Sequence, residues 1–346
     1  MSIVFASAQP REGVEKPMEV LSKFGPPFDY RGGYVSVGNF DGVHRGHQSI
    51  LATLTSQARE AHVPSVVLTF EPHPLSLLRP EQVPLRLTTL ETKAELLGRR
   101  GIDFVIAYPT DRTLLDMPPE EFFERVVREE LAAVGMVEGP NFFFGKNRAG
   151  DVQQLRALCE RDGLSLTVAA PMVLQSSRVS SSDIRTALST GRFDAAIAML
   201  GHPYRIRGVV AEGDGRGRQI GFPTANLTGI ETLIPADAVF AGVCLLGGKR
   251  IPAAVHIGPN PTFGAADRKV EVHLIDFAGD LYRQELCVDL FASVRDVTTF
   301  SDVAELTRQV ERDVQFVKQL TTRLQDACSG EFVPPSLNWN HPDPTA

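Results

Sequence analysis

Two histidines stand three residues apart in a segment that suits phosphate binding. The segment reads Val35-Ser-Val-Gly-Asn-Phe-Asp-Gly-Val-His-Arg-Gly-His47. Its first residues have a β pattern, Gly38 and Gly42 permit a tight turn, and a helix is predicted to begin near His47. Ligands of α/β sheets bind at such places, beyond the carboxyl end of a strand.

The start of a helix favours anions, because free N–H groups and the positive end of the helix dipole point outward there. The side chains of His44 and His47 can then donate hydrogen bonds to one triphosphate, and Gly46 leaves room for phosphates near the backbone. The alternative is a pair of surface or metal-binding histidines, since H-x-x-H alone is a weak signal. We interpret the whole segment as a nucleotide site.

A second candidate phosphate site lies between Gly213 and Asn226, where the chain reads GDGRGRQIGFPTAN. Its glycines predict a flexible loop that presents N–H groups to phosphates. Thr224 and Asn226 follow Pro223, and their oxygens suit a magnesium ion that bridges ATP phosphates. A glycine-rich loop alone is a weak signal.

A carboxylate with possible base chemistry, Glu271, stands in the β-like run Val270–Phe277 (VEVHLIDF). Alternation puts the valines and the leucine on one face, with Glu271 and His273 on the other. A carboxylate held on a strand beside a cation can accept a hydroxyl proton. The alternative is a solvated glutamate on a half-exposed strand.

The segments that must position the histidines alternate between strand-like and helix-like patterns. Strands are predicted at residues 34–37, 65–70, 103–108, 134–137 and 165–169. Helices are predicted at residues 48–62, 93–100, 118–134 and 152–162. This alternation predicts an α/β domain with a doubly wound parallel sheet covered on both faces.

The pattern changes after about residue 200, where short β runs are separated by glycine- and proline-rich turns. Strands are predicted at residues 205–211, 239–246, 251–257, 270–277 and 286–291, and one amphipathic helix at 301–324. This spacing predicts an antiparallel barrel or sandwich with a long terminal helix. We therefore expect one domain at residues 31–200, a second at 201–328, and extensions at 1–30 and 329–346.

Composition and net charge are typical of a soluble globular protein that does not mainly bind nucleic acid. The chain has 346 residues, 43% hydrophobic and 22% charged, which is typical of a soluble globular protein. No apolar run approaches the roughly 18 residues of a membrane span, and the N-terminus does not resemble a secretory signal. The four cysteines form no C-x-x-C pair, so we expect thiols in a cytoplasmic protein. A net charge of −7 argues against nucleic acid as the main partner.

A family resemblance is carried by the histidine segment together with three others. These are Leu68–Pro74 (LTFEPHP), Gly139–Asp151 (GPNFFFGKNRAGD) and Val179–Arg185 (VSSSDIR). The histidine segment resembles the H-x-G-H nucleotidyltransferases, which join the α-phosphate of a nucleotide to an acceptor and release pyrophosphate. All four together resemble the bifunctional bacterial riboflavin kinase/FAD synthetase family, in which the acceptor is FMN and ATP is the donor.

The resemblance implies roles for particular residues of the first half. His44 and His47 would stabilise phosphates, Ser180 to Ser182 would offer hydroxyl and N–H groups at a helix start, and Arg185 a positive charge. A plain helix cap is the alternative for the serines. The ATP-binding residues implied are Gly38, Asn39, Phe40, Asp41, Gly46, Ser180, Ser181, Ser182 and Arg185.

Aromatic residues near these segments could wall a flavin ring. The candidate flavin contacts are the aromatic residues Phe70, Phe142 and Phe144, together with the neighbouring Asn141. Phenylalanine in a β run is more often part of the core. Many members of the family have Asp at the position of Asn141, so a role that needs a charge is in doubt there.

The second half resembles riboflavin kinases through PTAN, IGPNPTF (Ile257–Phe263) and VEVHLIDF. The resemblance implies that Glu271 is the base for the riboflavin 5′-hydroxyl and that Thr224 and Asn226 bind Mg²⁺. The implied ATP-binding residues are Gly215, Gly217, Gly221, Pro223, Thr224 and Asn226. Two departures are Cys244, where the family usually has Tyr, and His256, where many members have Asn; we expect neither to lie among the chemical groups.

Three hypotheses follow. The first is a bifunctional enzyme that phosphorylates riboflavin to FMN and adenylylates FMN to FAD. The second is a single-activity FMN adenylyltransferase with a flavin-sensing C-terminal domain, which the retention of Thr224, Asn226 and Glu271 disfavours. The third is a regulatory or RNA-binding protein, which the acidic net charge disfavours. The sequence does not determine the oligomeric state, and we expect no membrane partner.

Overall fold

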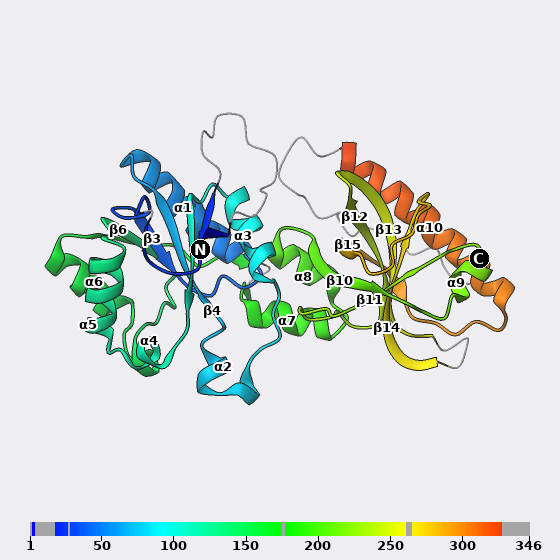
Figure 1. The fold of residues 1–346 in the computed structure, drawn as a ribbon, viewed down its shortest axis with the longest axis horizontal. Helices are drawn as coiled ribbons and strands as arrows, with labels where there is room; N and C mark the ends of the chain where they lie inside the picture. The colour runs from blue at the N-terminus through cyan, green and yellow to red at the C-terminus, as the bar shows by residue number, and fades with distance from the viewer. Residues whose placement is uncertain (1, 4–17, 27, 175–176, 261–264, 327–346) are drawn as a thin grey trace. The chain divides into compact units, whose positions relative to one another are not determined.

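The chain folds into two compact units, residues 1–180 and 181–346 (Figure 1). The computed structural model describes residues 2–3, 18–26, 28–174, 177–260 and 265–326. Cys328, most of the predicted N-terminal extension and the C-terminal extension therefore lie outside the described residues. No helix in the described part of the chain is long and apolar enough to cross a membrane.

The first unit is built on a mainly parallel sheet with the strand order β1-β2-β5-β4-β3-β6-β7. Its strands are β1 (Ser2–Ile3), β2 (Glu19–Leu21), β3 (Tyr34–Val37), β4 (Ser65–Glu71), β5 (Phe104–Pro109), β6 (Gly135–Glu138) and β7 (Ser165–Val168). All neighbours pair in parallel except β1 with β2. The predicted parallel sheet is confirmed, with β1 and β2 added at one edge.

Helices cover both faces of this sheet because the buried strands carry apolar residues on both sides. On β4, Val66 and Leu68 belong to one core cluster and Val67 to the other. The helical segments are α1 (Arg45–Glu60), α2 (Leu75–Leu78), η1 (Pro80–Gln82), α3 (Leu90–Arg99), α4 (Arg112–Asp116), α5 (Pro119–Phe122), η2 (Phe123–Glu130), η3 (Lys146–Arg148) and α6 (Val152–Asp162). A two-stranded sheet of β8 (Val173–Leu174) and β9 (Ser177–Arg178) follows.

The second unit is a closed antiparallel barrel with the strand order β10-β11-β14-β13-β12-β15. Its strands are β10 (Tyr204–Ala211), β11 (Ala225–Thr228), β12 (Ala238–Leu246), β13 (Lys249–Asn260), β14 (Ala265–Leu274) and β15 (Glu285–Asp296). Val270, Val272 and Leu274 are buried, and Glu271 and His273 alternate with them and are half-buried. The predicted barrel is confirmed, and β11 is a strand that the sequence analysis did not predict.

The described part of the second unit has four helices: α7 (Ser181–Ser189), α8 (Phe193–Leu200), α9 (Arg216–Gln219) and α10 (Val303–Asp326). Helix α10 packs against β12, β13 and β15, and its Val314, Val317 and Leu320 join Ala241 and Val243 in one core cluster. The apolar stripe of the predicted long helix therefore covers the outside of the barrel.

Helices α7 and α8 pack with the barrel, so the compact units divide before the predicted domain boundary. The ring of Phe193 on α8 lies 4.7 Å from the ring of Phe240 on β12, centroid to centroid. The backbone N–H of Ser293 donates to the Asp194 carboxylate on α8 at 3.3 Å.

Candidate active sites

The histidine pair stands at the first turn of α1, and each histidine orients the other. His44 is the N-cap residue, and its Nδ1 accepts a hydrogen bond from the backbone N–H of His47 at 3.3 Å. The two rings are stacked, with centroids 3.6 Å apart and planes 18° from parallel. Because Nδ1 of His44 is an acceptor, a neutral His44 carries its proton on Nε2.

His47 is held neutral by its surroundings. Burial lowers the pKa of His47 well below its ordinary value, and the nearby charges of His44 and Lys93 act in the same direction. A neutral imidazole still has one N–H donor, so it can bind a phosphate oxygen without bringing a full charge.

The turn before α1 is tied through Asp41 to the loop that precedes α3. Its carboxylate accepts hydrogen bonds from the backbone N–H groups of Leu87 and Thr88, both at 3.0 Å, and from the Thr88 hydroxyl at 3.1 Å. These bonds support a backbone with positive φ at Phe40 (47°) and Gly42 (81°). Such conformations persist only where neighbouring contacts enforce them.

A second layer of polar residues supports the turn, and sequence reasoning missed most of it. Asn39 Nδ2 lies 3.0 Å from Nε2 of His73, which places His73 beside the turn. The buried Lys93 donates to the Thr69 hydroxyl at 3.2 Å. Burial lowers the pKa of Lys93, while Asp41 and Glu71 oppose that shift. The sequence signal for Lys93 is only a lysine at an apolar helical spacing.

A cavity of about 240 Å³ opens beside the histidines. The predicted site residues that line it are Gly38, Phe40, His44, Gly46, His47, Asn141 and Phe142. Residues not predicted as site residues also line it, among them Glu138, Pro140, Ala169, Met172 and Arg178. A Cβ at Gly46 would lie 3.1 Å from the His44 ring, so this glycine makes space for the histidine itself.

The other predicted residues of the first half are not among those that line this cavity. Phe144 is buried and stacks on Phe142 with centroids 5.5 Å apart, and Phe70 packs against the same core cluster. Ser180 follows Val179, which lines the cavity. Ser181, Ser182 and Arg185 lie on α7, in the second unit.

In the barrel, strand pairing aligns three polar residues in one row. Asn226 of β11 pairs with Glu271 of β14, and Glu271 pairs with His256 of β13. Directly paired residues point to the same face of a sheet, with Cβ atoms about 5 Å apart. His256, expected to lie outside the chemistry, is therefore a direct neighbour of the predicted base. Its Nε2 lies 3.1 Å from the Pro259 carbonyl oxygen.

The glycine-rich segment wraps closely around Thr224 and Asn226. A Cβ at Gly213 would lie 2.0 Å from the Asn226 amide nitrogen, and one at Gly217 would lie 3.3 Å from the Thr224 hydroxyl. Between Gly215 (φ 66°) and Gly221 (φ 87°) the chain forms the short helix α9. The predicted flexible loop is thus partly helical, and only Gly217 and Thr224 of the six predicted ATP-binding residues line the cavity beside it.

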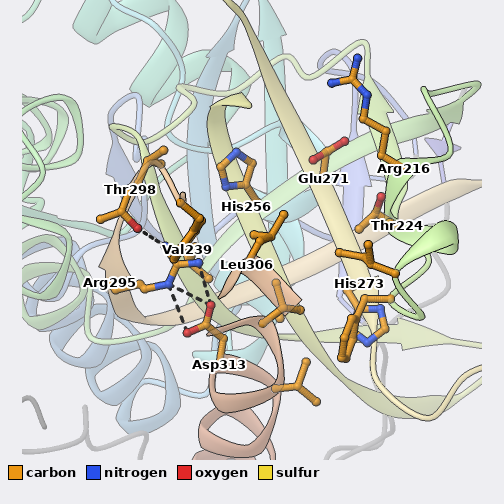
Figure 2. Close-up of a pocket in the computed structure, with 18 of the residues that line it drawn as sticks. Arg216, Thr224, Val239, His256, Glu271, His273, Arg295, Thr298, Leu306 and Asp313 are labelled. Carbon is orange, nitrogen blue, oxygen red and sulfur yellow. Dashed lines mark hydrogen bonds and ion pairs between the residues drawn. The ribbon is translucent and has the colours of Figure 1, made fainter. Parts of the chain in front are cut away.

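This second cavity, of about 140 Å³, lies between the outer face of the barrel and α10. Figure 2 shows Thr224, Glu271 and Arg216 at one end and Arg295 with Asp313 at the other. Arg295 Nη2 lies 2.8 Å from the buried Asp313 carboxylate, and Gln309 donates to the same carboxylate at 2.8 Å. The same cavity is also lined by apolar side chains: Val239, Ala254, Leu306, Val310 and Val314.

The donor set at Thr224 and Asn226 fits magnesium in chemical type. Hydroxyl and amide oxygens are ligands that hard cations accept, and the Glu271 carboxylate stands across from Asn226. Among the described residues, no group of three or more His, Cys, Asp or Glu side chains could hold a metal ion.

Comparisons with known proteins give each unit a family. The model of the FAD synthetase family matches residues 28–183, and that of the riboflavin kinase family matches residues 200–321. A solved structure titled macrolide-efflux protein from Streptococcus pneumoniae has a TM-score of 0.76 at 27% identity, over 86% of this chain and 98% of that chain.

Three curated relatives share one name, bifunctional riboflavin kinase/FMN adenylyltransferase. The Pseudomonas fluorescens protein is 36% identical over 84% of this chain and 94% of its own length. The Escherichia coli K12 protein is 36% identical over 81% and 90%, and the Bacillus subtilis protein 32% identical over 81% and 90%. The chain therefore belongs to the bifunctional riboflavin kinase/FMN adenylyltransferase family.

Proposed function

We propose that this chain makes FAD from riboflavin in two ATP-dependent steps, each in its own cavity. The barrel cavity phosphorylates riboflavin to FMN, and the cavity beside α1 adenylylates FMN. The observation that carries the proposal is that each unit has its own cavity with groups suited to phosphate transfer. The chemistry also requires two ATP sites, since one reaction is at the γ-phosphorus and the other at the α-phosphorus.

In the adenylyltransferase step, an FMN phosphate oxygen attacks the α-phosphorus of ATP. The bond from that phosphorus to the bridging oxygen breaks, and pyrophosphate leaves without a covalent enzyme intermediate. The protein must hold the reactants in line and compensate the charge that develops on the leaving group. The N–H donors of His44 and His47 and the first turn of α1 serve that charge, and Asp41 holds the turn in place.

We propose that the flavin ring of FMN binds in the part of this cavity near Asn141 and Phe142. Phe142 presents a half-buried ring, and Phe144 stacks behind it. Phe70 supports the same core. Ser180, Ser181, Ser182 and Arg185 complete the set of proposed phosphate ligands, as the family resemblance implies.

In the kinase step, the riboflavin 5′-hydroxyl oxygen attacks the γ-phosphorus of ATP and ADP leaves. Glu271 accepts the hydroxyl proton, and its place on a paired strand limits its movement. Thr224 and Asn226 would hold Mg²⁺, which supplies charge compensation between the phosphates. The apolar residues between the barrel and α10 offer a surface for the flavin ring.

The alternative of a flavin-sensing barrel has less support, because a sensor needs no base. Thr224 and Glu271 line one cavity, and Asn226 pairs with Glu271 on the neighbouring strand, which suits a kinase. We place the protein in the cytoplasm and keep residues 31–200 and 201–328 as the proposed catalytic domains.

One assay tests both activities. The purified protein is incubated with riboflavin, ATP and magnesium, and riboflavin, FMN and FAD are separated by chromatography. Both FMN and FAD should form. A lack of FMN would refute the kinase assignment, and a lack of FAD from supplied FMN would refute the adenylyltransferase assignment.

A further inference from the structure

A carboxyl group is buried in the wall of the adenylyltransferase cavity. Glu138 ends β6, is only 2% exposed, and lines the same cavity as His44 and His47. One of its oxygens accepts the backbone N–H of Val37 at 2.7 Å, directly before the turn that leads to the histidines. The mechanism above gives this carboxyl group no role.

The surroundings of Glu138 favour its neutral form. In the described part of the chain no cationic side chain forms an ion pair with it, and a buried carboxylate without such a partner is costly. Burial raises the pKa of Glu138 well above its ordinary value, and the Val37 hydrogen bond only partly opposes this.

The titratable groups near Glu138 do not supply a compensating charge. His47 is held neutral, and among the described residues neither His44 nor Arg178, which line the same cavity, forms an ion pair with Glu138. Cys159 of α6 lies close enough for Glu138 to affect it, and burial raises the pKa of that thiol to about 11. The neighbouring thiol is therefore uncharged at neutral pH.

We propose that the Glu138 carboxyl group belongs to the nucleotide site of the adenylyltransferase and that ATP binds there only while this group is neutral. A triphosphate is a polyanion, and a carboxylate in the wall of the same cavity repels it. A protonated carboxyl group keeps its acceptor for Val37 N–H and has one O–H donor for the nucleotide. This inference rests on the proposed function of the cavity.

Protonation of the Glu138 carboxyl group and binding of ATP therefore favour each other. Above the pKa of Glu138, the fraction of competent protein falls about tenfold per pH unit, and the apparent affinity for ATP falls with it. The kinase site has no such group in its wall, where the carboxylates are Asp214, Glu271 and the paired Asp313. The two ATP sites of one chain should therefore respond differently to alkaline pH.

The test measures the KM for ATP of both reactions across a pH series, in the same full-length protein and solutions. Ionisation of ATP and its magnesium complex affects both reactions, so it cancels in the ratio of the two KM values. In the wild type this ratio, adenylyltransferase over kinase, should rise by up to about tenfold per pH unit on the alkaline side. A flat ratio in the wild type overturns the proposal.

Two variants test whether Glu138 causes the alkaline rise of the KM ratio. Glu138→Gln keeps an oxygen for Val37 N–H but cannot ionise, so the alkaline rise should disappear. Glu121→Gln, which removes an exposed carboxylate of the same unit, should retain the rise. A rise that persists in Glu138→Gln overturns the proposal, and an absence of FAD at every pH refutes the function of the cavity instead.

Discussion

The two cavities differ in how the chain brings their residues together. At the proposed adenylyltransferase cavity, the turn proposed to bind phosphate is continuous in sequence, and His44 caps the helix that carries His47 three residues later. At the proposed kinase site, Asn226 meets Glu271 only through strand pairing, and Arg295 meets Asp313 only because α10 folds back onto the barrel. A site built within one helical turn can be read from local sequence, whereas a cross-strand site cannot.

The two cavities also differ in how their titratable groups are stabilised. The first has the half-buried His47 and the buried Glu138 in its wall and the buried Lys93 nearby, and desolvation shifts the pKa values of all three. The second neutralises its buried carboxylate, Asp313, with a bidentate arginine. We therefore expect pH to act mainly on the first unit and loss of an ion pair mainly on the second.

The largest expected effect separates the two reactions through the kinase base. Glu271→Ala should lower the rate of FMN formation by about 10²–10⁴-fold, because no other group is proposed to accept the hydroxyl proton. FAD formation from supplied FMN should change little. Initial rates measured by chromatography check this, with Glu285→Gln as a control that removes an exposed strand carboxylate. A kinase rate within a few-fold of wild type would show that Glu271 is not the base.

Substitution of His47 should have the opposite effect and impair FAD formation rather than FMN formation. His47→Ala removes one phosphate donor and should lower FAD formation by about 10²–10³-fold. FMN formation should continue, because the barrel has its own cavity. His62→Asn, at an exposed position with positive φ, is the control. Equal losses of both activities would mean that the two reactions do not have separate sites.

A smaller effect concerns the stability of the barrel. Asp313→Asn leaves Arg295 without its charged partner and should lower the unfolding free energy of the second unit by about 2 kcal/mol, since the pair is largely buried. The KM for riboflavin should rise. Chemical denaturation with flavin kinetics measures both, and Asp237→Asn breaks a more exposed arginine pair as the control. An equal effect of the two variants would contradict the role of burial.

The smallest effect is a pH dependence of the first unit. The unfolded chain takes up a proton on His47 near its ordinary pKa of about 6.5, whereas the folded unit does so only at much lower pH. Stability is therefore highest above that value and falls as the pH decreases. Between about pH 7.5 and about pH 5.5 the loss should reach up to about 1.4 kcal/mol.

Denaturation of wild type and His47→Ala over this range isolates the contribution of His47. The variant should lose less stability than wild type on acidification. Identical slopes for the two proteins would mean that His47 titrates normally in the folded state.

Sequence patterns predicted most of the fold because the signals were strong and local. The strands at β3, β4 and β5 are runs rich in apolar residues, and the barrel strand β10 alternates between buried and more exposed residues. The strands β2 and β11 were missed because each is short and stabilised by its neighbours in the sheet. The helical turn α9 was missed because its residues follow a glycine and favour a loop.

By itself the sequence predicted the chemical type of each site: paired histidines at a helix start, and a threonine, an asparagine and a carboxylate on or beside strands. Only the tertiary structure decided which other residues share those cavities. Lys93, Glu138, His256 and Arg295 are unremarkable in sequence, and they gain their importance from burial and from the register of neighbouring strands. The physical reason is that desolvation and cross-strand contact depend on what surrounds a side chain, which the local sequence does not contain.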